Sequence, residues 1–526
     1  MRTTLYASFI ALFLLLGSGC SRQDDDAGAT GETGETAAVA EEAPVIMEAD
    51  EAEGEAGNGE LPISTESDQA AELYAKGEYL MDVGRGVQAR AQFREVIEAD
   101  PGFVRAYWGV SNVALSFNEF QEVLDEAGMH YEGAPASDKS LIEINRSFLS
   151  NDPAAGEKVA EKLVAEYPQS PRAHIVLAGM QAASNNNEAA RRSFNKALEI
   201  DPQSAGALMG LTNNYLFGEP KDFNKAAEVI GRFNTAYPGE ARGFEALGDI
   251  HRAEGDLESA LAAYQRAGEI DPTLELALHK QGHINSFLGN IDEARASYDA
   301  AIEAAPAESK ASYAVYKCFT RIHAGDIEAA IDELLALADS VAAMGTPPDQ
   351  VKGLQVFALT SAAQAALHGG MYDQAAEIIQ RRSELNLAIA ADVGTEDAER
   401  LQRADNLMWS GLLNAYQGNR ETAENDASQI ATLVADDDNP RKMEPVHWVR
   451  GAAALKAGDY ATAVSELRQA DHANDMYIRY QLAQALEGAG EVEEAQPLYQ
   501  QVADFNFNSV GFALVGDEAQ EKVAGS

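Results

Sequence analysis

Residues 241–306 contain one pattern of small, apolar and aromatic residues written twice in succession. The first copy consists of Phe244, Leu247, Gly248, Gly255, Ala260, Tyr264, Ala267 and Pro272, and the second of Leu278, Gln281, Gly282, Gly289, Ala294, Tyr298, Ala301 and Pro306. The prolines give the period, since 306 − 272 = 34 and 272 − 238 = 34. A fixed period of about 34 residues is typical of a solenoid built from helix–turn–helix units.

Each copy predicts two helices joined by a glycine turn. Within 241–254 the apolar and small residues recur three or four apart, which places them on one face of a helix. Gly255 suits the left-handed position that ends a helix, and Asp256 is expected to cap the next helix. In the second copy, Asn290 and Glu293 predict a capping box at the corresponding place.

Small side chains predict how the two helices of a unit meet. Gly248 and Ala260 are expected to let the two backbones approach closely, and Tyr264 to fill the space toward the next unit. The pattern resembles the tetratricopeptide repeat (TPR) family, which implies an all-α fold: a right-handed α-solenoid of about a dozen helical hairpins. One such hairpin cannot bury both of its apolar faces, so it depends on its neighbours.

The quality of the match divides the chain into stretches. Residues 169–306 match well, 67–168 form partly degenerate hairpins, and 307–504 form C-terminal hairpins with longer loops. Residues 505–526 break the phase and are expected to cap the last apolar face. In the C-terminal stretch an alanine follows each turn glycine by five residues, at Gly325, Gly370, Gly418, Gly458 and Gly490.

The first 19 residues predict export. A short positive start is followed by an apolar run, Leu5 to Leu16, which is too short to span a bilayer and typical of a signal peptide. The sequence that follows resembles a bacterial lipobox, which implies lipidation at Cys20; Gly17 stands where that family prefers leucine. Ser21 implies sorting to the outer membrane. The other cysteine, Cys318, is expected to be a small buried hydrophobe.

Acidic residues dominate the rest of the chain. Residues 20–66 hold fourteen Asp or Glu and one Arg, a composition that predicts a disordered, self-repelling tether. The whole chain carries a net charge of −46. This charge argues against nucleic acid as a partner and against docking of the protein body on an anionic membrane, so membrane contact is expected through the lipid alone.

The family resemblance implies that the first helix of each unit lines a groove for a protein or peptide partner. Carried onto the two strong copies, it assigns to this groove Arg242, Glu245, Asp249, Arg252, His279, His283 and Ser286. Trp409, Trp448 and Tyr477 fall near groove positions in the C-terminal units, where packing in the core is the alternative. Of the residues that clamp peptide C-termini in some members, Asn213 stands alone and Lys280 is one position away.

His279 and His283 are the one pair of residues whose spacing could bind a metal ion. Two imidazoles at i and i+4 point the same way from a helix, with Glu245 or Asp249 as neighbouring carboxylates. No phosphate loop and no nucleophile elbow is present. We therefore predict neither a metal nor another cofactor, and no catalytic residue. The alternative is a metal-dependent hydrolase that uses this histidine groove.

These features together predict a non-enzymatic scaffold. It would be a lipoprotein of the bacterial cell envelope, anchored to the outer membrane and facing the periplasm. The assemblies to which similar lipoproteins belong are those of outer-membrane proteins, of secretion or pili, and of polysaccharide export. An unanchored periplasmic adaptor is the alternative location.

Overall fold

The computed structural model describes residues 61–150 and 152–525, and every regular element in this part of the chain is a helix. The predicted signal peptide, Cys20 and most of the acidic tether lie outside the described residues. The described chain divides into two compact units, unit 1 ending at Pro220 and unit 2 beginning at Lys221. None of the described helices is both long and apolar enough to cross a bilayer.

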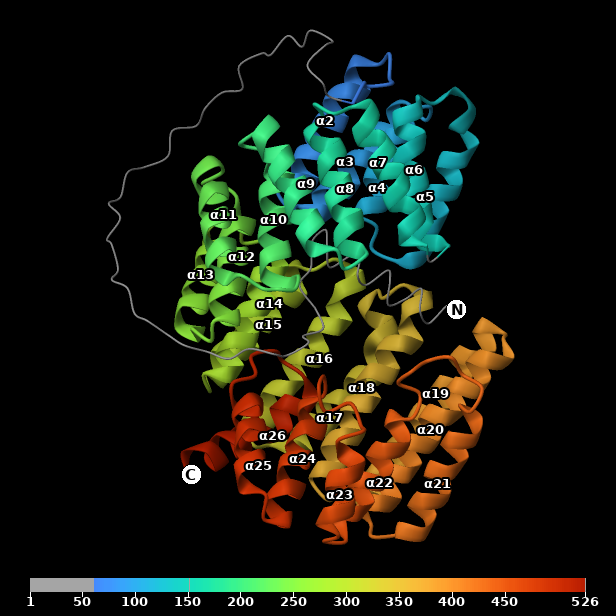
Figure 1. Cartoon of the computed structure of the whole chain (residues 1–526), viewed down its shortest axis with the longest axis vertical. Coiled ribbons are helices and arrows are strands. Elements are labelled where there is room, and N and C mark those ends of the chain that lie inside the picture. Colours follow the sequence, from blue (N-terminus) through green and yellow to red (C-terminus); the bar gives the residue numbers. More distant parts are fainter. Residues whose placement is uncertain (1–60, 151, 526) are drawn as a thin grey trace. The chain divides into compact units, whose positions relative to one another are not determined.

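Unit 1 is a series of helical hairpins (Figure 1). Its helices are α2 (Asp68–Asp82), α3 (Gly86–Ala99), α4 (Val104–Asn112), α5 (Phe117–Met129), α6 (Ala136–Leu149), α7 (Pro153–Glu166), α8 (Pro171–Ala183), α9 (Asn187–Ile200) and α10 (Ala205–Phe217), with a 3₁₀ turn at Tyr131–Gly133. Consecutive helices α2 to α9 pair as hairpins, and α10 packs on both α8 and α9.

Unit 2 continues the same architecture with helices of more variable length. Its helices are α11 (Phe223–Ala236), α12 (Ala241–Ala253), α13 (Leu257–Ile270), α14 (Glu275–Phe287), α15 (Ile291–Ala304), α16 (Ala307–His323), α17 (Ile327–Ser340), α18 (Pro348–His368), α19 (Tyr372–Val393), α20 (Glu396–Tyr416), α21 (Arg420–Leu433), α22 (Glu444–Lys456), α23 (Tyr460–Leu467), α24 (Met476–Ala489), α25 (Val492–Ala503) and α26 (Val510–Ala524), with a 3₁₀ turn at Val341–Met344. The all-α solenoid predicted from the repeat period is confirmed.

Glycine turns set the phase of the hairpins, as predicted. Gly255 and the five turn glycines of the C-terminal stretch have φ between +71° and +85°, the left-handed region that glycine enters without steric cost. Asp256 then caps α13 by accepting a hydrogen bond from the Ser259 N–H at 3.0 Å. The alanines five residues after the C-terminal glycines are completely buried between helices: Ala330, Ala375, Ala423, Ala463 and Ala495.

Close contact between helices requires glycine at one position of each strong hairpin. A methyl group built on Gly248 would lie 2.4 Å from the Tyr264 ring, and one on Gly282 would lie 2.7 Å from the Tyr298 ring. Tyr264 also clusters with Ala260 and with Ile284 of the next hairpin. The small residues thus let a tyrosine join two hairpins, as the sequence predicted.

Replacing Gly248 with alanine is expected to lower stability, whereas the same change at Gly231 is expected to raise it. At Gly248 the added methyl overpacks the core, at a cost of about 1–3 kcal/mol that exceeds the helix propensity gained. Gly231 lies inside α11 with nothing within 4 Å of a built methyl, so it gains only helix propensity. Thermal unfolding of the two variants should shift in opposite directions, and shifts of the same sign would contradict this packing.

One local expectation needs correction. Asn290 precedes α15 without capping it through its side chain, and its amide instead donates to Asn285 Oδ1 at 3.3 Å. The boundary between the two units falls after Pro220, within the stretch 169–306 that matches the repeat well.

The buried cysteine behaves as expected. Cys318 is 6% exposed within the core of unit 2, and its thiol lies 3.2 Å from the Ala314 carbonyl one turn earlier. Burial raises the pKa of the Cys318 thiol to about 12. This thiol is therefore a packing group and not a reactive one.

Candidate functional site

The first helices of the hairpins form what we call the inner surface of each unit. In unit 2 this surface comprises α12, α14, α16, α18, α20, α22 and α24. All seven residues predicted for the groove lie on its first two helices, Arg242, Glu245, Asp249 and Arg252 on α12 and His279, His283 and Ser286 on α14. Six are buried and His283 is half-buried.

A buried group of charges joins α12 to α14. The Lys280 ammonium forms ion pairs with both carboxylates of α12, with Glu245 and, at 2.5 Å, with Asp249. Arg242 pairs with Glu245 at 2.7 Å, and the Tyr264 hydroxyl donates to Asp249 at 2.7 Å. The two carboxylates are 1% and 5% exposed. Each buried charge thus has a partner of opposite sign, which such burial requires.

The charges of this group also set its ionisation. Burial alone would raise the pKa of the Asp249 carboxyl, but the Lys280 ammonium and the Arg252 guanidinium hold that pKa below its usual value. Arg252 lies 3.8 Å from Asp249 and therefore remains near it as a fixed cation on the inner surface. Asp249 stays ionised and orients both cations.

The residues between α25 and α26, which we call the C-terminal segment (505–509), lie against this surface. Arg252 donates to the backbone carbonyl of Asn506 at 3.1 Å, and the Asn506 amide donates to the Arg252 carbonyl. The Arg252 guanidinium also lies 3.9 Å from the centre of the Phe507 ring. A predicted groove residue therefore already binds polypeptide, and that polypeptide is part of the same chain.

Contacts of the C-terminal segment continue onto His283 of α14, Tyr298 of α15 and His323 of α16. The Asn508 amide donates to the Tyr298 hydroxyl at 2.9 Å and lies 3.2 Å from His283 Nδ1. The helix that follows, α26, packs on α24 and α25 at the end of the array and also on α16 and α18 of the inner surface. The stretch expected only to cap the last hairpin thus also covers part of the inner surface.

The histidine pair takes part in packing. The rings of His279 and His283 lie 4.1 Å apart, and His279 stacks on Tyr313 at 4.2 Å. His283 Nδ1 lies 2.7 Å from the Tyr298 hydroxyl. Lys280 forms ion pairs with both neighbouring carboxylates, Glu245 and Asp249. Among residues 61–150 and 152–525, no three His, Cys, Asp or Glu side chains lie close enough together to hold a metal ion.

Burial makes the histidine pair a source of acid sensitivity. Burial and the Lys280 charge lower the pKa of His279 to about 3. The unfolded chain takes up a proton near pH 6.5, so stability should fall as the pH drops below that value. By pH 5 the loss from His279 amounts to about 2 kcal/mol. In the variant His279→Leu the stability difference between pH 7 and pH 5, measured by urea unfolding, should shrink by that amount; an unchanged difference would contradict it.

The aromatic residues predicted near groove positions are buried in the core. Trp409 and Trp448 meet edge to face with ring centres 6.3 Å apart, and the Trp448 indole donates to Gln481 at 2.9 Å. Tyr477 is 4% exposed, and its hydroxyl lies 3.0 Å from that of Tyr416. Packing, the alternative stated for these residues, accounts for Trp409 and Trp448, whereas Tyr477 also lines the cavity described next.

One part of the inner surface of unit 2 stays open. A cavity of about 640 Å³ lies among α18, α20, α22, α24 and α26. Four tyrosines line it (Tyr416, Tyr460, Tyr477 and Tyr480), together with Lys456 and Lys522. The Lys456 ammonium lies 4.7 Å from the centre of the Tyr416 ring, a cation–π contact. Polar side chains line it as well, among them His368, Gln484, Glu487 and Glu518, so the cavity offers aromatic area together with hydrogen-bonding and charged groups.

Sequence reasoning missed Lys280 and the C-terminal segment. Lys280 was noted only as a residue one position away from a peptide-clamp pattern, although a lysine amid apolar residues of a first helix was a signal for a buried ion pair. The contacts of Asn506 with Arg252 join residues 254 positions apart. No repeat pattern marks such a contact.

The stacked hairpins and their inner surface define an α-solenoid repeat protein. A model described as tetratricopeptide repeat-like domain matches residues 125–275, and models described as tetratricopeptide repeat match 276–308, 74–128, 445–469 and 476–501. The chain belongs to the tetratricopeptide repeat family.

Curated relatives are longer proteins. Over 501 residues, or 84% of the chain, it is 24% identical to cellulose synthase operon protein C of Xanthomonas axonopodis pv. citri (strain 306), of which it spans 32%. Over 152 residues, or 28% of the chain, it is 29% identical to the protein of that name from Pseudomonas fluorescens (strain SBW25), of which the match covers 12%. The match to the Arabidopsis thaliana CTR9 homolog is 26% identical over 199 residues, 36% of the chain and 18% of that protein.

Solved structures with similar repeats include YrrB, described as a TPR protein with an unusual peptide-binding site. It shares 24% identity, covers 35% of this chain and 91% of its own, and gives a TM-score of 0.26. The APC/C hetero-tetramer Cut9-Hcn1 shares 16% identity, covers 82% of this chain and 76% of its own, and gives a TM-score of 0.38.

Proposed function

We propose that this protein is a non-enzymatic scaffold whose inner surfaces bind polypeptide partners in the bacterial cell envelope. The observation that carries the proposal is the C-terminal segment on the inner surface of unit 2. Arg252 there donates to a main-chain carbonyl and covers an aromatic ring with its guanidinium. A main-chain carbonyl is present in every polypeptide, so the same chemistry serves a segment of another protein.

The tyrosine-lined cavity is the place we assign to the partner. It lies beyond the inner-surface helices that the C-terminal segment covers, and Tyr460 at its edge is 39% exposed. Tyrosine side chains bind polypeptide well because they combine apolar area with a hydrogen-bond donor. The net charge of −46 would draw basic segments toward the protein from a distance.

Anchoring through a lipid at Cys20 would hold the scaffold at the outer membrane, facing the periplasm. The relatives named for a cellulose synthase operon favour an assembly that handles a polysaccharide over secretion or pilus assembly. In this proposal the protein binds a polypeptide component of the assembly and not the polysaccharide itself.

Site-specific photocrosslinking tests the proposed partner surface. With benzoylphenylalanine at Tyr460 in the full chain, irradiation of native envelopes should give a crosslinked product that proteinase degrades and glycosidases leave intact. The same probe at Val492, which is 48% exposed and outside the cavity, should give none. Gln484→Trp, which fills the cavity, should abolish the product at position 460. A saccharide product, or equal yields at both positions, would contradict the proposal.

Membrane fractionation tests the anchor separately. The variant Cys20→Ala should move from the carbonate-washed membrane pellet to the soluble fraction, because the lipid is the proposed membrane contact. Retention of this variant in the pellet would overturn the lipid anchor and leave the polypeptide-binding surface untouched.

A further inference from the structure

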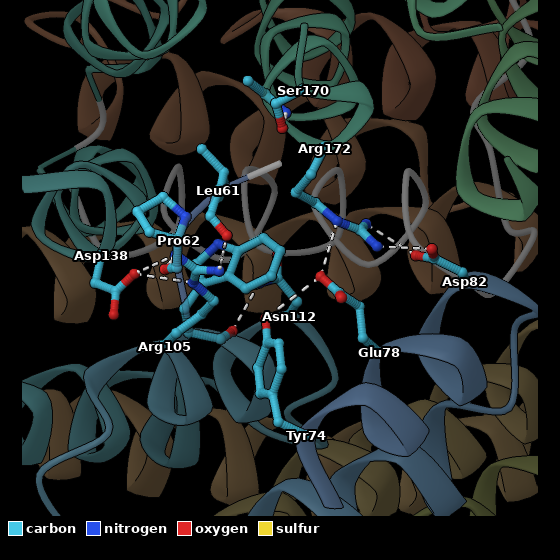
Figure 2. A network of polar contacts seen from close by, with 12 residues as sticks. Leu61, Pro62, Tyr74, Glu78, Asp82, Arg105, Asn112, Asp138, Ser170 and Arg172 are labelled. Carbon is cyan, nitrogen blue, oxygen red and sulfur yellow. Dashed lines mark hydrogen bonds and ion pairs between the residues drawn. The ribbon is translucent and has the colours of Figure 1, made fainter. Parts of the chain in front are cut away.

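Residues 61–65, which we call the N-terminal strap, lie on the inner surface of unit 1. This surface is formed by the first helices α2, α4, α6, α8 and α10. The strap has no regular secondary structure and leads into α2 at Asp68. Figure 2 shows Leu61 and Pro62 of the strap beside Arg105 of α4, with Asp138 of α6 on the other side of the guanidinium.

Arg105 binds the main chain of the strap. Its guanidinium donates to the Leu61 carbonyl at 3.2 Å and to the Pro62 carbonyl at 2.7 Å. The same group is held by Asp138, with contacts of 2.8 Å and 2.6 Å to one carboxylate oxygen. The Ser64 hydroxyl donates to the other oxygen of Asp138 at 2.6 Å. One arginine–carboxylate pair thus binds two main-chain carbonyls and one hydroxyl of the strap.

An empty site of this kind would be costly. Arg105 is 4% exposed and Asp138 is completely buried. Without the strap, two guanidinium donors and one carboxylate oxygen would lose their partners in a poorly hydrated place. The pair therefore favours an occupant that supplies two successive carbonyls, whether from this chain or from another.

The strap itself is held by few contacts. The Leu61 side chain is buried, but Ile63 is 53% exposed and Pro62 is exposed. Thr65 donates a further hydrogen bond to Asp100 at 2.5 Å. A short irregular segment with one buried side chain belongs to the less stable parts of a fold, so it opens without unfolding the unit.

The same device appears on both inner surfaces. In unit 2, Arg252 beside Asp249 donates to the Asn506 carbonyl, as Arg105 beside Asp138 does to the strap. In unit 1 one further donor remains unused: the buried Trp108 indole N–H, one turn after Arg105 on α4, has no acceptor among the described residues. The strap is therefore an incomplete ligand for this surface.

We propose that the strap is an internal placeholder, and that a partner segment of similar chemistry displaces it from the Arg105–Asp138 site. The partner segment has an apolar residue followed by proline, with a serine or threonine two residues after the proline. Proline presents its carbonyl in an extended backbone with little entropy to lose, which suits the arginine. The inference rests on the proposed scaffold function, because it gives unit 1 a second partner site and a means of closing it.

A peptide-binding assay on the full chain tests the placeholder. The probe is a fluorescent synthetic peptide with the sequence of residues 57–67, measured by anisotropy. The wild-type protein should bind it weakly, because the attached strap competes at an effective concentration on the order of millimolar. Leu61→Asp places a charge in the buried position and should release the strap, which increases the affinity for the peptide at least 10-fold.

Two further variants make the result specific. Ile63→Asp adds the same charge at the neighbouring exposed position and should bind like wild type. Adding Arg105→Lys to Leu61→Asp should remove the gain, since lysine lacks the planar fork that reaches two carbonyls. Equal affinity of the Leu61→Asp and Ile63→Asp variants, or a gain that survives Arg105→Lys, would overturn the inference.

Failure here is separable from failure of the proposed function. If the peptide does not bind while the Tyr460 crosslink forms, the placeholder is wrong and the scaffold stands. If the peptide binds and the Tyr460 crosslink is absent, the placeholder stands and the partner surface in unit 2 is wrong. Circular dichroism of the Leu61→Asp variant should show the helix content of wild type, which shows that the released strap leaves unit 1 folded, and its unfolding temperature should lie below that of Ile63→Asp because the Arg105–Asp138 site has lost its occupant.

Discussion

The variant Lys280→Met should destabilise unit 2 by about 3–5 kcal/mol, the usual cost of removing one partner from a buried ion pair. Methionine fills nearly the same volume but leaves Glu245 and Asp249 without the ammonium that joins them. Both carboxylates are at least nine-tenths buried, so water cannot replace the lost cation. Urea unfolding followed by the fluorescence of Trp409 and Trp448, which both lie in unit 2, measures the loss.

Two controls identify the cause of that loss. Arg266→Ala removes an exposed pair with Glu269 on the neighbouring helix α13, and should cost no more than about 1 kcal/mol. The double variant with Lys280→Met and Asp249→Asn removes one carboxylate with the ammonium, leaves Glu245 paired with Arg242, and should recover part of the stability. If Lys280→Met costs no more than Arg266→Ala, the buried charges do not join α12 to α14 as described.

Phe512→Ala should detach α26 from the inner surface of unit 2. Phe512 is 5% exposed and lies with its ring centre 5.4 Å from that of Phe287 and 5.6 Å from that of Phe505. Truncating a buried phenylalanine costs about 3–5 kcal/mol. Because α26 is the last of the described helices and packs at the end of the array, we expect this cost to appear as local opening of α26.

Hydrogen exchange measures this opening directly. The amides of α26 should exchange on the order of 10²-fold faster in Phe512→Ala than in wild type, while those of α20 and α22 change little. Val492→Ala, a truncation at an exposed position of α25, serves as the control and should leave α26 protected. Unchanged exchange in α26 would mean that its contacts with the inner surface contribute little to holding it.

The repeat period predicted most of the fold because each hairpin is specified locally. The left-handed glycine at 255, the small residue at 248 and the tyrosine at 264 all act within one or two hairpins, so their spacing alone identified the turn and the packing. The same logic found Ala330 and its counterparts in the C-terminal hairpins. At Asn290 the sequence was compatible with two hydrogen bonds, one that caps α15 and one to the side-chain amide of Asn285. The spacing of the residues does not decide between them.

The sequence indicated on which helices the candidate site residues lie, but not which residues they contact. Arg252 and His283 lie on the first helices α12 and α14, as the repeat spacing implies, and their role in a partner groove stays a prediction. Their partners Asn506 and Asn508 lie more than 200 positions away in the sequence, and nothing in a repeat pattern specifies such contacts. The contacts of the strap with Arg105 and Asp138 were also not predicted. The strap lies within residues 20–66, which the sequence predicted to be a disordered tether.

Intramolecular photocrosslinking from the C-terminal segment tests most directly whether the inner surface binds polypeptide. Benzoylphenylalanine at Phe507, whose ring lies 3.9 Å from the Arg252 guanidinium, should crosslink within the full chain to the α12 residues 241–253. Mass spectrometry of the digested monomer identifies the site. Crosslinks confined to an outer helix such as α13, or no intramolecular crosslink at all, would contradict the binding of the C-terminal segment to the inner surface.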